Sequence, residues 1–206
     1  MFNIDNKVFQ KSLMYDGKVM LKYKIEFPQI KGYDKFNIVN YTQALELQKK
    51  CEENLYQDAK NLYEYNKQNN YPFFPFEVVS GYLITYNYDD IISLYYDEYI
   101  YSGGAHGNTL RTSQSWKMKD QTLIDLADYF PKEPNYVSKI IEDINLQIEQ
   151  NIKNGNNYYF ENYCCLTSSK FRVENFYLSN GNIIIYYQQY DIAPYSSGIL
   201  NFLIDI

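Results

Sequence analysis

The sequence is poor in the residue types that build metal centres and disulfide frameworks. Its 206 residues include one histidine and three cysteines, Cys51, Cys164 and Cys165. A single histidine without any C-x-x-C spacing gives no pattern of zinc ligands. Cys164 and Cys165 are neighbours in the chain, and neighbouring cysteines rarely reach the geometry of a relaxed disulfide. We therefore predict a fold that depends on no disulfide framework, no metal and no cofactor.

Long apolar runs and positive charge are also scarce. No stretch approaches the roughly 18 apolar residues of a transmembrane helix, and the first residues lack the apolar centre of a signal peptide. Either the protein is cytoplasmic, or a membrane anchor lies outside this sequence. The formal net charge of −6 argues against nucleic acid or an anionic membrane as partner, and it suits a cationic partner.

Tyrosine is the residue type in excess. The chain has 25 tyrosines and 12 phenylalanines but one tryptophan. Tyrosine combines an apolar ring with a polar tip, so it suits strands and binding faces. An AT-rich genome, whose codons favour tyrosine, asparagine, isoleucine and lysine, explains the same excess without any function. With 46% hydrophobic and 21% charged residues, the chain has the composition of a globular protein.

Hydrophobic periodicity predicts an α+β fold. A helix capped by Asn40 and a second helix from Pro134 to Lys153 each show an apolar face. Thr122 and Asp125 resemble a capping box that opens a short helix. Alternation, or apolar runs between turn residues, predicts strands over residues 21–27, 76–86, 91–101, 109–118, 171–178, 182–188 and 199–206.

The order of these elements indicates how they assemble. Strands, a helix, more strands, helices and final strands follow one another without regular βα alternation. This order favours antiparallel sheets, each packed by a long amphipathic helix. The polar and proline-containing run 66–75 is the best boundary. We therefore expect two subdomains, residues 1–72 and residues 73–206.

A glycine-rich stretch after the 91–101 strand is the first candidate site. Residues 102–107 read Ser-Gly-Gly-Ala-His-Gly and hold the only histidine, His106. Glycines allow positive φ and expose backbone N–H groups, so the loop suits an anion nest or an oxyanion hole beside His106. The alternative is a glycine-rich turn with a structural histidine. The spacing matches neither a Walker loop nor a G-x-G-x-x-G motif.

Two catalytic constellations around His106 are conceivable. A serine hydrolase would use Ser196 or Ser197 as nucleophile, His106 as base and Asp191 as orienting acid, but the sequence has no G-x-S-x-G elbow. A metal site would join His106 to Asp89, Asp90 or Asp191, although one histidine is thin for a transition metal.

A binding surface is the other alternative. Exposed tyrosine beside glycine and serine is typical of interfaces. The tyrosines around the glycine stretch and around residues 190–195 are Tyr95, Tyr96, Tyr99, Tyr101, Tyr190 and Tyr195.

Two motifs carry a family resemblance. The run Y-I-Y-S-G-G-A-H-G over residues 99–107 resembles the Y-x-Y-T-G-G-A-H-G motif of the RsiV-type C-terminal domain, with Ser102 where the motif often has threonine. The run Y-D-I-A-P-Y-S-S-G over residues 190–198 resembles that domain's Y-x-I-A-P-Y-x-x-G motif, and residues 125–130 resemble its D-L-F segment. Upstream, residues 23–30 resemble the strand ending in Y-P-Q-I of the companion PdaC-type domain. Together the two domains cover nearly the whole chain.

The resemblance implies a non-catalytic module. Such tandem domains occur outside the membrane in the anti-sigma factor RsiV, where they bind lysozyme, and beside the catalytic domain of the peptidoglycan deacetylase PdaC. This sequence has neither a sigma-binding segment nor a deacetylase domain, so only recognition carries over. The resemblance thus implies an extracytoplasmic or cell-envelope module that binds a lysozyme-like cationic protein or a peptidoglycan fragment.

The two motif loops are the expected binding residues, and we expect them to be neighbours. The rival hypothesis is a hydrolase or a metal-dependent enzyme that uses His106. The candidate ligand- or partner-binding residues are Tyr101, Ser102, Gly103, Gly104, Ala105, His106, Gly107, Tyr190, Asp191, Pro194 and Tyr195.

Overall fold

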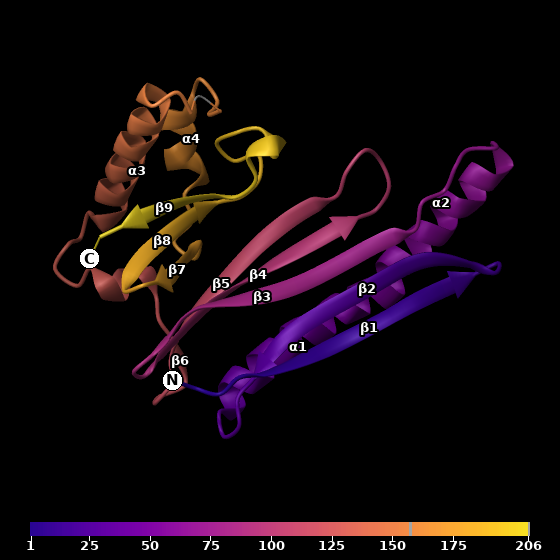
Figure 1. The fold of residues 1–206 in the computed structure, drawn as a ribbon, viewed down its shortest axis with the longest axis horizontal. Helices are drawn as coiled ribbons and strands as arrows, with labels where there is room; N and C mark the ends of the chain where they lie inside the picture. Colours follow the sequence, from indigo (N-terminus) through magenta and orange to yellow (C-terminus); the bar gives the residue numbers. More distant parts are fainter. Residues whose placement is uncertain (157, 206) are drawn as a thin grey trace. The chain divides into compact units, whose positions relative to one another are not determined.

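The computed structural model, which describes residues 1–156 and 158–205, has two β-sheets and several helices (Figure 1). The α+β prediction is confirmed. One sheet has six strands in the order β1-β2-β3-β4-β5-β6, and the other has the order β7-β8-β9. The strands are β1 Asp5–Tyr15, β2 Lys18–Gln29, β3 Phe76–Tyr88, β4 Ile91–Tyr101, β5 Asn108–Lys117, β6 Thr122–Leu123, β7 Phe176–Ser179, β8 Asn182–Tyr187 and β9 Leu200–Ile204. The helices are α1 Asp34–Lys50, α2 Tyr56–Gln68, α3 Tyr136–Lys153 and α4 Tyr163–Lys170, with a π-helical turn Cys51–Leu55 and 3-10 turns Leu126–Tyr129 and Tyr195–Ser197.

The chain forms two compact units that are not contiguous in the sequence. Unit 1 contains Leu83–Tyr95 and Arg111–Ile206, together with Met1, and unit 2 contains Phe2–Tyr82 and Tyr96–Leu110. The long strands β3, β4 and β5 contribute residues to both units. The sequence prediction, in contrast, divides the chain once, between residues 72 and 73.

In unit 2, helices α1 and α2 cover one face of the sheet, and their apolar residues meet β2. Leu21, Tyr23, Ile25 and Phe27 alternate along β2 and are buried, as the period of two predicts. β1 pairs antiparallel with β2, but β2 and β3 are parallel. This departure from the predicted antiparallel sheet has a simple cause, because the helices between β2 and β3 return the chain to the end from which β2 started.

The predicted start of the first helix is wrong. Helix α1 begins at Asp34, and Asn40 lies inside it, fully buried. The Asn40 amide donates to the Phe36 carbonyl, and its side-chain oxygen accepts from the Tyr96 hydroxyl. A buried tyrosine tip needs a partner, so Asn40 satisfies Tyr96 and caps no helix.

The π-helical turn between α1 and α2 serves a second tyrosine. Tyr23 donates to Glu52 Oε1 at 2.6 Å, and Gln48 Nε2 donates to the Tyr23 hydroxyl at 3.1 Å. Burial, followed by the bond to Glu52, raises the pKa of Tyr23 to about 12. Gln48 and Glu52 are four residues apart, so they lie on one face of the helix and converge on the Tyr23 hydroxyl.

In unit 1, α3 packs on the β7-β8-β9 sheet. Ile140, Ile144 and Ile148 form the buried stripe of α3. The β7–β8 hairpin turns at Asn180 and Gly181, whose positive φ values of 50° and 84° are those of a two-residue Asn-Gly hairpin turn. The core of this unit consists of Leu126, Ile140, Ile144, Ile148, Phe171, Phe176, Leu178, Ile183, Ile185, Tyr187, Ile192, Phe202 and Ile204.

Two local predictions for unit 1 need correction. The capping box lies one turn later than predicted, because Asp125 is the N-cap and Asp128 returns its side chain to the Asp125 N–H. Thr122 instead lies in the short strand β6. The predicted strand 171–178 begins only at Phe176, and helix α4 ends just before residue 171.

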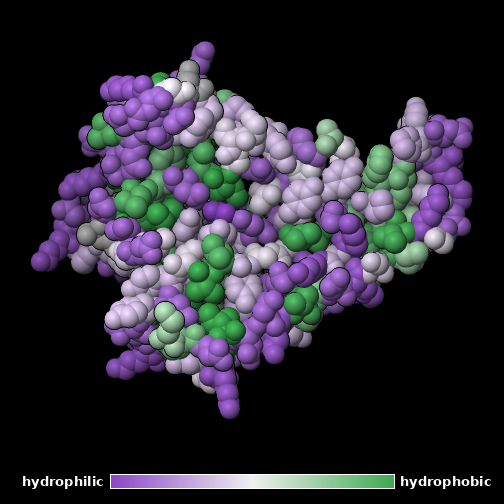
Figure 2. Space-filling view, viewed as in Figure 1, coloured by the Kyte–Doolittle hydropathy of each residue, from purple (hydrophilic) through white to green (hydrophobic). Residues whose placement is uncertain are grey.

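The surface is mixed in polarity. On the face drawn in Figure 2, apolar side chains reach the surface in separate groups divided by hydrophilic residues. Across the described residues no helix is both long and apolar enough to cross a bilayer.

Candidate functional site

The glycine loop in unit 2 is held by the two tyrosines that precede it. Gly103 and Gly104 have φ values of 97° and 91°, which favour glycine. The Tyr101 hydroxyl donates to the Gly104 carbonyl at 3.2 Å. Gly107 is buried, and a Cβ at this position would lie 2.4 Å from two ring carbons of Tyr99 and 2.6 Å from its hydroxyl oxygen. The spacing between Tyr99 and Gly107 in the motif therefore reflects the packing of the loop on β4, the strand that precedes it.

The loop presents its remaining residues to solvent. Ser102, Ala105 and His106 are exposed, and His106 Nδ1 lies 2.9 Å from the Gly107 carbonyl oxygen. The tyrosines and glycines maintain the loop, while the histidine stands at its surface. Tyr99 and Gly107 thus carry the packing role that the alternative interpretation assigns to His106.

The second motif loop, in unit 1, has a strained residue at its tip. Tyr190 has a φ of 67°, which is uncommon for a residue with a large side chain. The Gln188 N–H donates to Asp191 Oδ2 at 2.8 Å, and the Asp191 N–H donates to the Gln188 carbonyl at 3.1 Å. These two bonds close a turn around Tyr190 and keep it in the left-handed region. Burial raises the pKa of the Asp191 carboxyl, against the lowering effect of the Gln188 N–H.

Buried residues anchor the rest of this loop. Ile192 and Ala193 are 1% and 3% exposed, and the Ile192 carbonyl accepts from the Phe160 N–H. Pro194 is exposed, and the 3-10 turn Tyr195–Ser197 follows it. The loop is therefore fixed at its centre by buried residues, while Pro194 is exposed.

The two tyrosines of this loop form an aromatic pair at the surface. Tyr190 is 53% exposed and Tyr195 is half-buried. Their ring centroids lie 5.7 Å apart with an interplanar angle of 36°. This separation is within the range of favourable ring pairs. A strained backbone thus presents one large ring beside another on a well-anchored loop.

The base of the loop is tied to strand β5 by residues that sequence reasoning missed. The Gln188 side chain accepts from the Arg111 N–H at 2.9 Å and donates to the Arg111 carbonyl at 2.6 Å. The Arg111 guanidinium lies 3.7 Å from the ring centroid of Tyr95, and Tyr186 lies on this cluster as well. A glutamine amide here pairs with a strand edge as another strand would. No sequence signal marks a contact between residues so far apart in the chain.

The catalytic alternatives find their groups on separate units. His106 belongs to unit 2, whereas Asp191, Ser196 and Ser197 belong to unit 1. Within residues 1–156 and 158–205, no three His, Cys, Asp or Glu side chains gather as a metal site would require. The two motif loops also lie in different units, so their expected proximity stays a prediction.

The two motif loops lie within matches to two different families. The family described as "Deacetylase PdaC" matches residues 16–109, which include the glycine loop. The family described as "Protein of unknown function (DUF3298)" matches residues 127–206, which include the tyrosine loop. The two matched regions follow one another, so they fit a tandem of a PdaC-type domain and a DUF3298 domain. The recognition of an RsiV-like tandem from its motifs is confirmed, although the glycine motif, attributed above to the C-terminal domain, lies in the PdaC match.

Solved structures share the fold of the tandem. A DUF3298 family member from Bacteroides fragilis is 17% identical, with a TM-score of 0.67 over 99% of this chain and 90% of that one. A DUF3298 family protein from Pseudomonas aeruginosa is 13% identical, with a TM-score of 0.62 over 100% of this chain and 91% of that one. At these identities the likeness shows the fold alone. Among curated proteins none matches the chain.

Proposed function

We propose that the tandem is a non-catalytic recognition module of the cell envelope that binds a cationic, lysozyme-like protein. The PdaC-type and DUF3298 matches support an extracytoplasmic, cell-wall-related role. The observation that carries the proposal is the surface pair of exposed Tyr190 and half-buried Tyr195 on the anchored loop of unit 1. Tyrosine supplies a large contact area at a low cost in conformational entropy, so exposed tyrosines are frequent anchors of protein interfaces.

The backbone strain at Tyr190 supports a binding role for the tyrosine pair. A left-handed conformation costs a non-glycine residue roughly 1–2 kcal/mol. Glycine or asparagine would fit this turn with less strain, so folding alone does not explain a tyrosine here. Strained residues held by their surroundings concentrate at functional sites. We therefore assign the Tyr190 ring a role in binding.

Charge favours a cationic partner for the same unit. Unit 1 holds 13 acidic and 8 basic side chains, so it carries most of the net charge of −6. Opposite charge on a partner speeds association and makes the affinity depend on salt. A peptidoglycan fragment is the second candidate ligand, because the family matched by residues 16–109 is described as a deacetylase named PdaC.

Calorimetric titration with lysozyme at low and at physiological ionic strength tests the proposal. We expect saturable binding that weakens as salt rises, and a loss of at least about tenfold, or about 1.4 kcal/mol, in the double variant Tyr190→Ser and Tyr195→Ser. Tyr88→Ser is the matched control, because Tyr88 is a 66% exposed tyrosine of unit 1 outside the loop. Titration with muropeptides in place of lysozyme tests the second ligand. Absence of lysozyme binding at low salt would contradict the proposal.

A further inference from the structure

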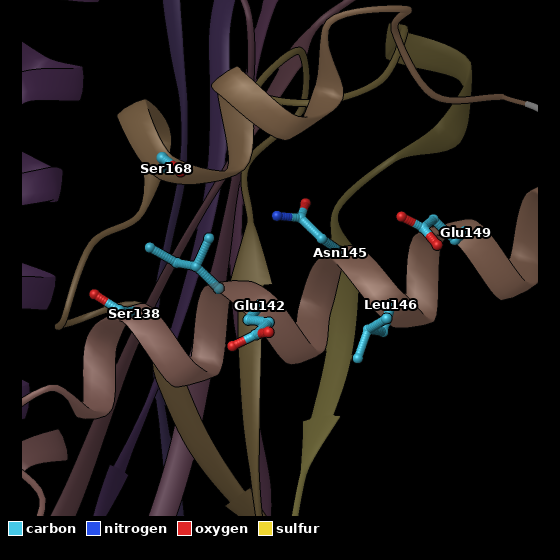
Figure 3. Close-up of a pocket in the computed structure, with 7 residues that line it drawn as sticks. Ser138, Glu142, Asn145, Leu146, Glu149 and Ser168 are labelled. Carbon is cyan, nitrogen blue, oxygen red and sulfur yellow. The ribbon is translucent and has the colours of Figure 1, made fainter.

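A hollow of about 460 Å³ lies along helix α3 beside α4, and its lining residues belong to neither motif loop. Figure 3 shows side chains from α3 and Ser168 from α4 around it. Glu142, Leu146 and Glu149 follow one another at spacings of four and three residues, so they share one face of α3. All residues that line the hollow belong to unit 1. The hollow is therefore a property of one compact unit.

Leu146, the exposed apolar residue of this surface, lies outside the buried stripe of α3. Leu146 is 58% exposed, while the buried stripe of α3 runs through Ile140, Ile144 and Ile148. Ile141 adds a partly buried apolar side chain to the hollow. An exposed leucine over a hollow gains free energy when a partner side chain covers it.

Two carboxylates, those of Glu142 and Glu149, flank Leu146 on the same face of α3. Glu142 and Glu149 are exposed, and within the described residues neither one forms an ion pair. The lysine nearest in sequence on the N-terminal side, Lys139, is paired with Glu133. Seven residues of helix separate the two carboxylates by about 10 Å along the axis. The surface thus presents the negative charges of Glu142 and Glu149 seven residues, or one heptad, apart, with the apolar Leu146 between them.

The contacts between α3 and α4 hold this surface in place. Thr167 of α4 is fully buried, and its hydroxyl is 2.9 Å from Asn145 Oδ1 of α3. The Tyr187 hydroxyl of β8 donates to the Thr167 carbonyl at 2.9 Å. A surface whose helices are already fixed loses little entropy when a partner docks.

We propose that this α3 surface docks a cationic amphipathic helix of a protein partner, with basic residues one heptad apart on either side of an apolar residue. The proposal rests on the proposed function in that the partner is cationic, and it adds the place and geometry of contact. A helix laid along α3 would bring its basic residues to Glu142 and Glu149 and its apolar residue to Leu146. The same carboxylates would repel an anionic chain.

Two probes test the surface independently of the tyrosine loop. The first is lysozyme, and the second is a synthetic amphipathic peptide in which lysines seven residues apart flank a leucine. A peptide of the same composition with its lysines distributed around the helix is the control probe. The full chain is compared with Glu142→Gln/Glu149→Gln and with Glu161→Gln/Glu174→Gln, which removes the same charge from exposed sites of unit 1. Thermal unfolding confirms that both variants fold.

We expect the designed peptide to bind the full chain at low salt and the control peptide to bind at least about fivefold more weakly. Glu142→Gln/Glu149→Gln weakens the designed peptide, and any lysozyme binding, by about fivefold or more, because exposed pairs contribute modestly and two are lost. Glu161→Gln/Glu174→Gln changes binding less than about twofold. Peptide binding without lysozyme binding supports this surface and contradicts the proposed function. Lysozyme binding that both double variants weaken equally overturns the surface and leaves the proposed function standing. Failure to bind the designed peptide also overturns the surface.

Discussion

Gly107→Ala tests whether the glycine motif exists to pack its own loop. A Cβ at residue 107 would lie 2.4 Å from Cε2 and Cζ of Tyr99, where ordinary contacts begin at 3.4 Å, so the ring must retreat by about 1 Å. Crowding of this kind costs typically about 1–3 kcal/mol. Gly107 is not among the glycines with positive φ, so the backbone itself accepts alanine. We therefore expect Gly107→Ala to lower the free energy of unfolding by about 2 kcal/mol through Tyr99 alone.

A double-mutant cycle with Tyr99→Ala isolates this contact. In the Tyr99→Ala background the new methyl group meets no ring, and Gly107→Ala becomes neutral or stabilising by about 0.4–1 kcal/mol through the unfolded chain. Urea unfolding followed by circular dichroism measures all four proteins. Gly104→Ala is the control, since residue 104 has a φ of 91° and no neighbour within 4 Å, so its cost does not depend on Tyr99. Additivity of Gly107→Ala and Tyr99→Ala within about 0.5 kcal/mol would refute the reasoning.

Three further predictions concern unit 1 and the thiols. Gln188→Ala removes both hydrogen bonds of the amide to the β5 backbone and lowers the free energy of unfolding by about 2 kcal/mol, measured by urea unfolding; an unchanged midpoint would show that the clamp is dispensable. The raised pKa of Asp191 means that its carboxyl binds its proton more tightly in the folded state than in the unfolded state. The stability that this gives is fully present below about pH 4 and is lost as pH rises through the folded pKa. Asp191→Asn removes this loss, and unfolding midpoints measured from pH 4 to 7 are flatter than in the parent chain. A chromogenic disulfide reagent at neutral pH modifies exposed Cys164 and Cys165 quickly, whereas Cys51 reacts only on unfolding, because burial raises its pKa to about 12; three fast thiols would contradict this burial.

The strands that carry one buried face could be predicted from the sequence. β2 alternates buried and exposed residues, and the hairpin at Asn180 and Gly181 has turn residues that fit its positive φ values. Strand β1 could not be predicted because nearly all of its residues are exposed. An edge strand with both faces exposed to solvent shows no alternation of apolar and polar residues. The helix boundary predicted at Asn40 is wrong because the same asparagine side chain can either cap a helix or accept a hydrogen bond from a buried tyrosine.

The candidate site was predictable only in its local part. Motif spacing identified both loops, since glycine positions and tyrosine positions follow from contacts within a few residues, as between Tyr99 and Gly107. The clamp of Gln188 on Arg111 joins residues 77 positions apart, and nothing in either local sequence requires it. The strain at Tyr190 was equally hidden, because a tyrosine in a loop has no sequence mark for a positive φ.

Tyr190→Gly tests the central claim most directly, because it separates binding from folding. Glycine relieves roughly 1–2 kcal/mol of backbone strain. It also costs about 0.5–1 kcal/mol in chain entropy and removes a ring pair of about 0.5–1.5 kcal/mol. The free energy of unfolding therefore stays within about 1 kcal/mol of the parent value. The account predicts that this variant, titrated calorimetrically with lysozyme at low salt, binds at least about tenfold more weakly. A variant that binds as the parent chain does would contradict the account.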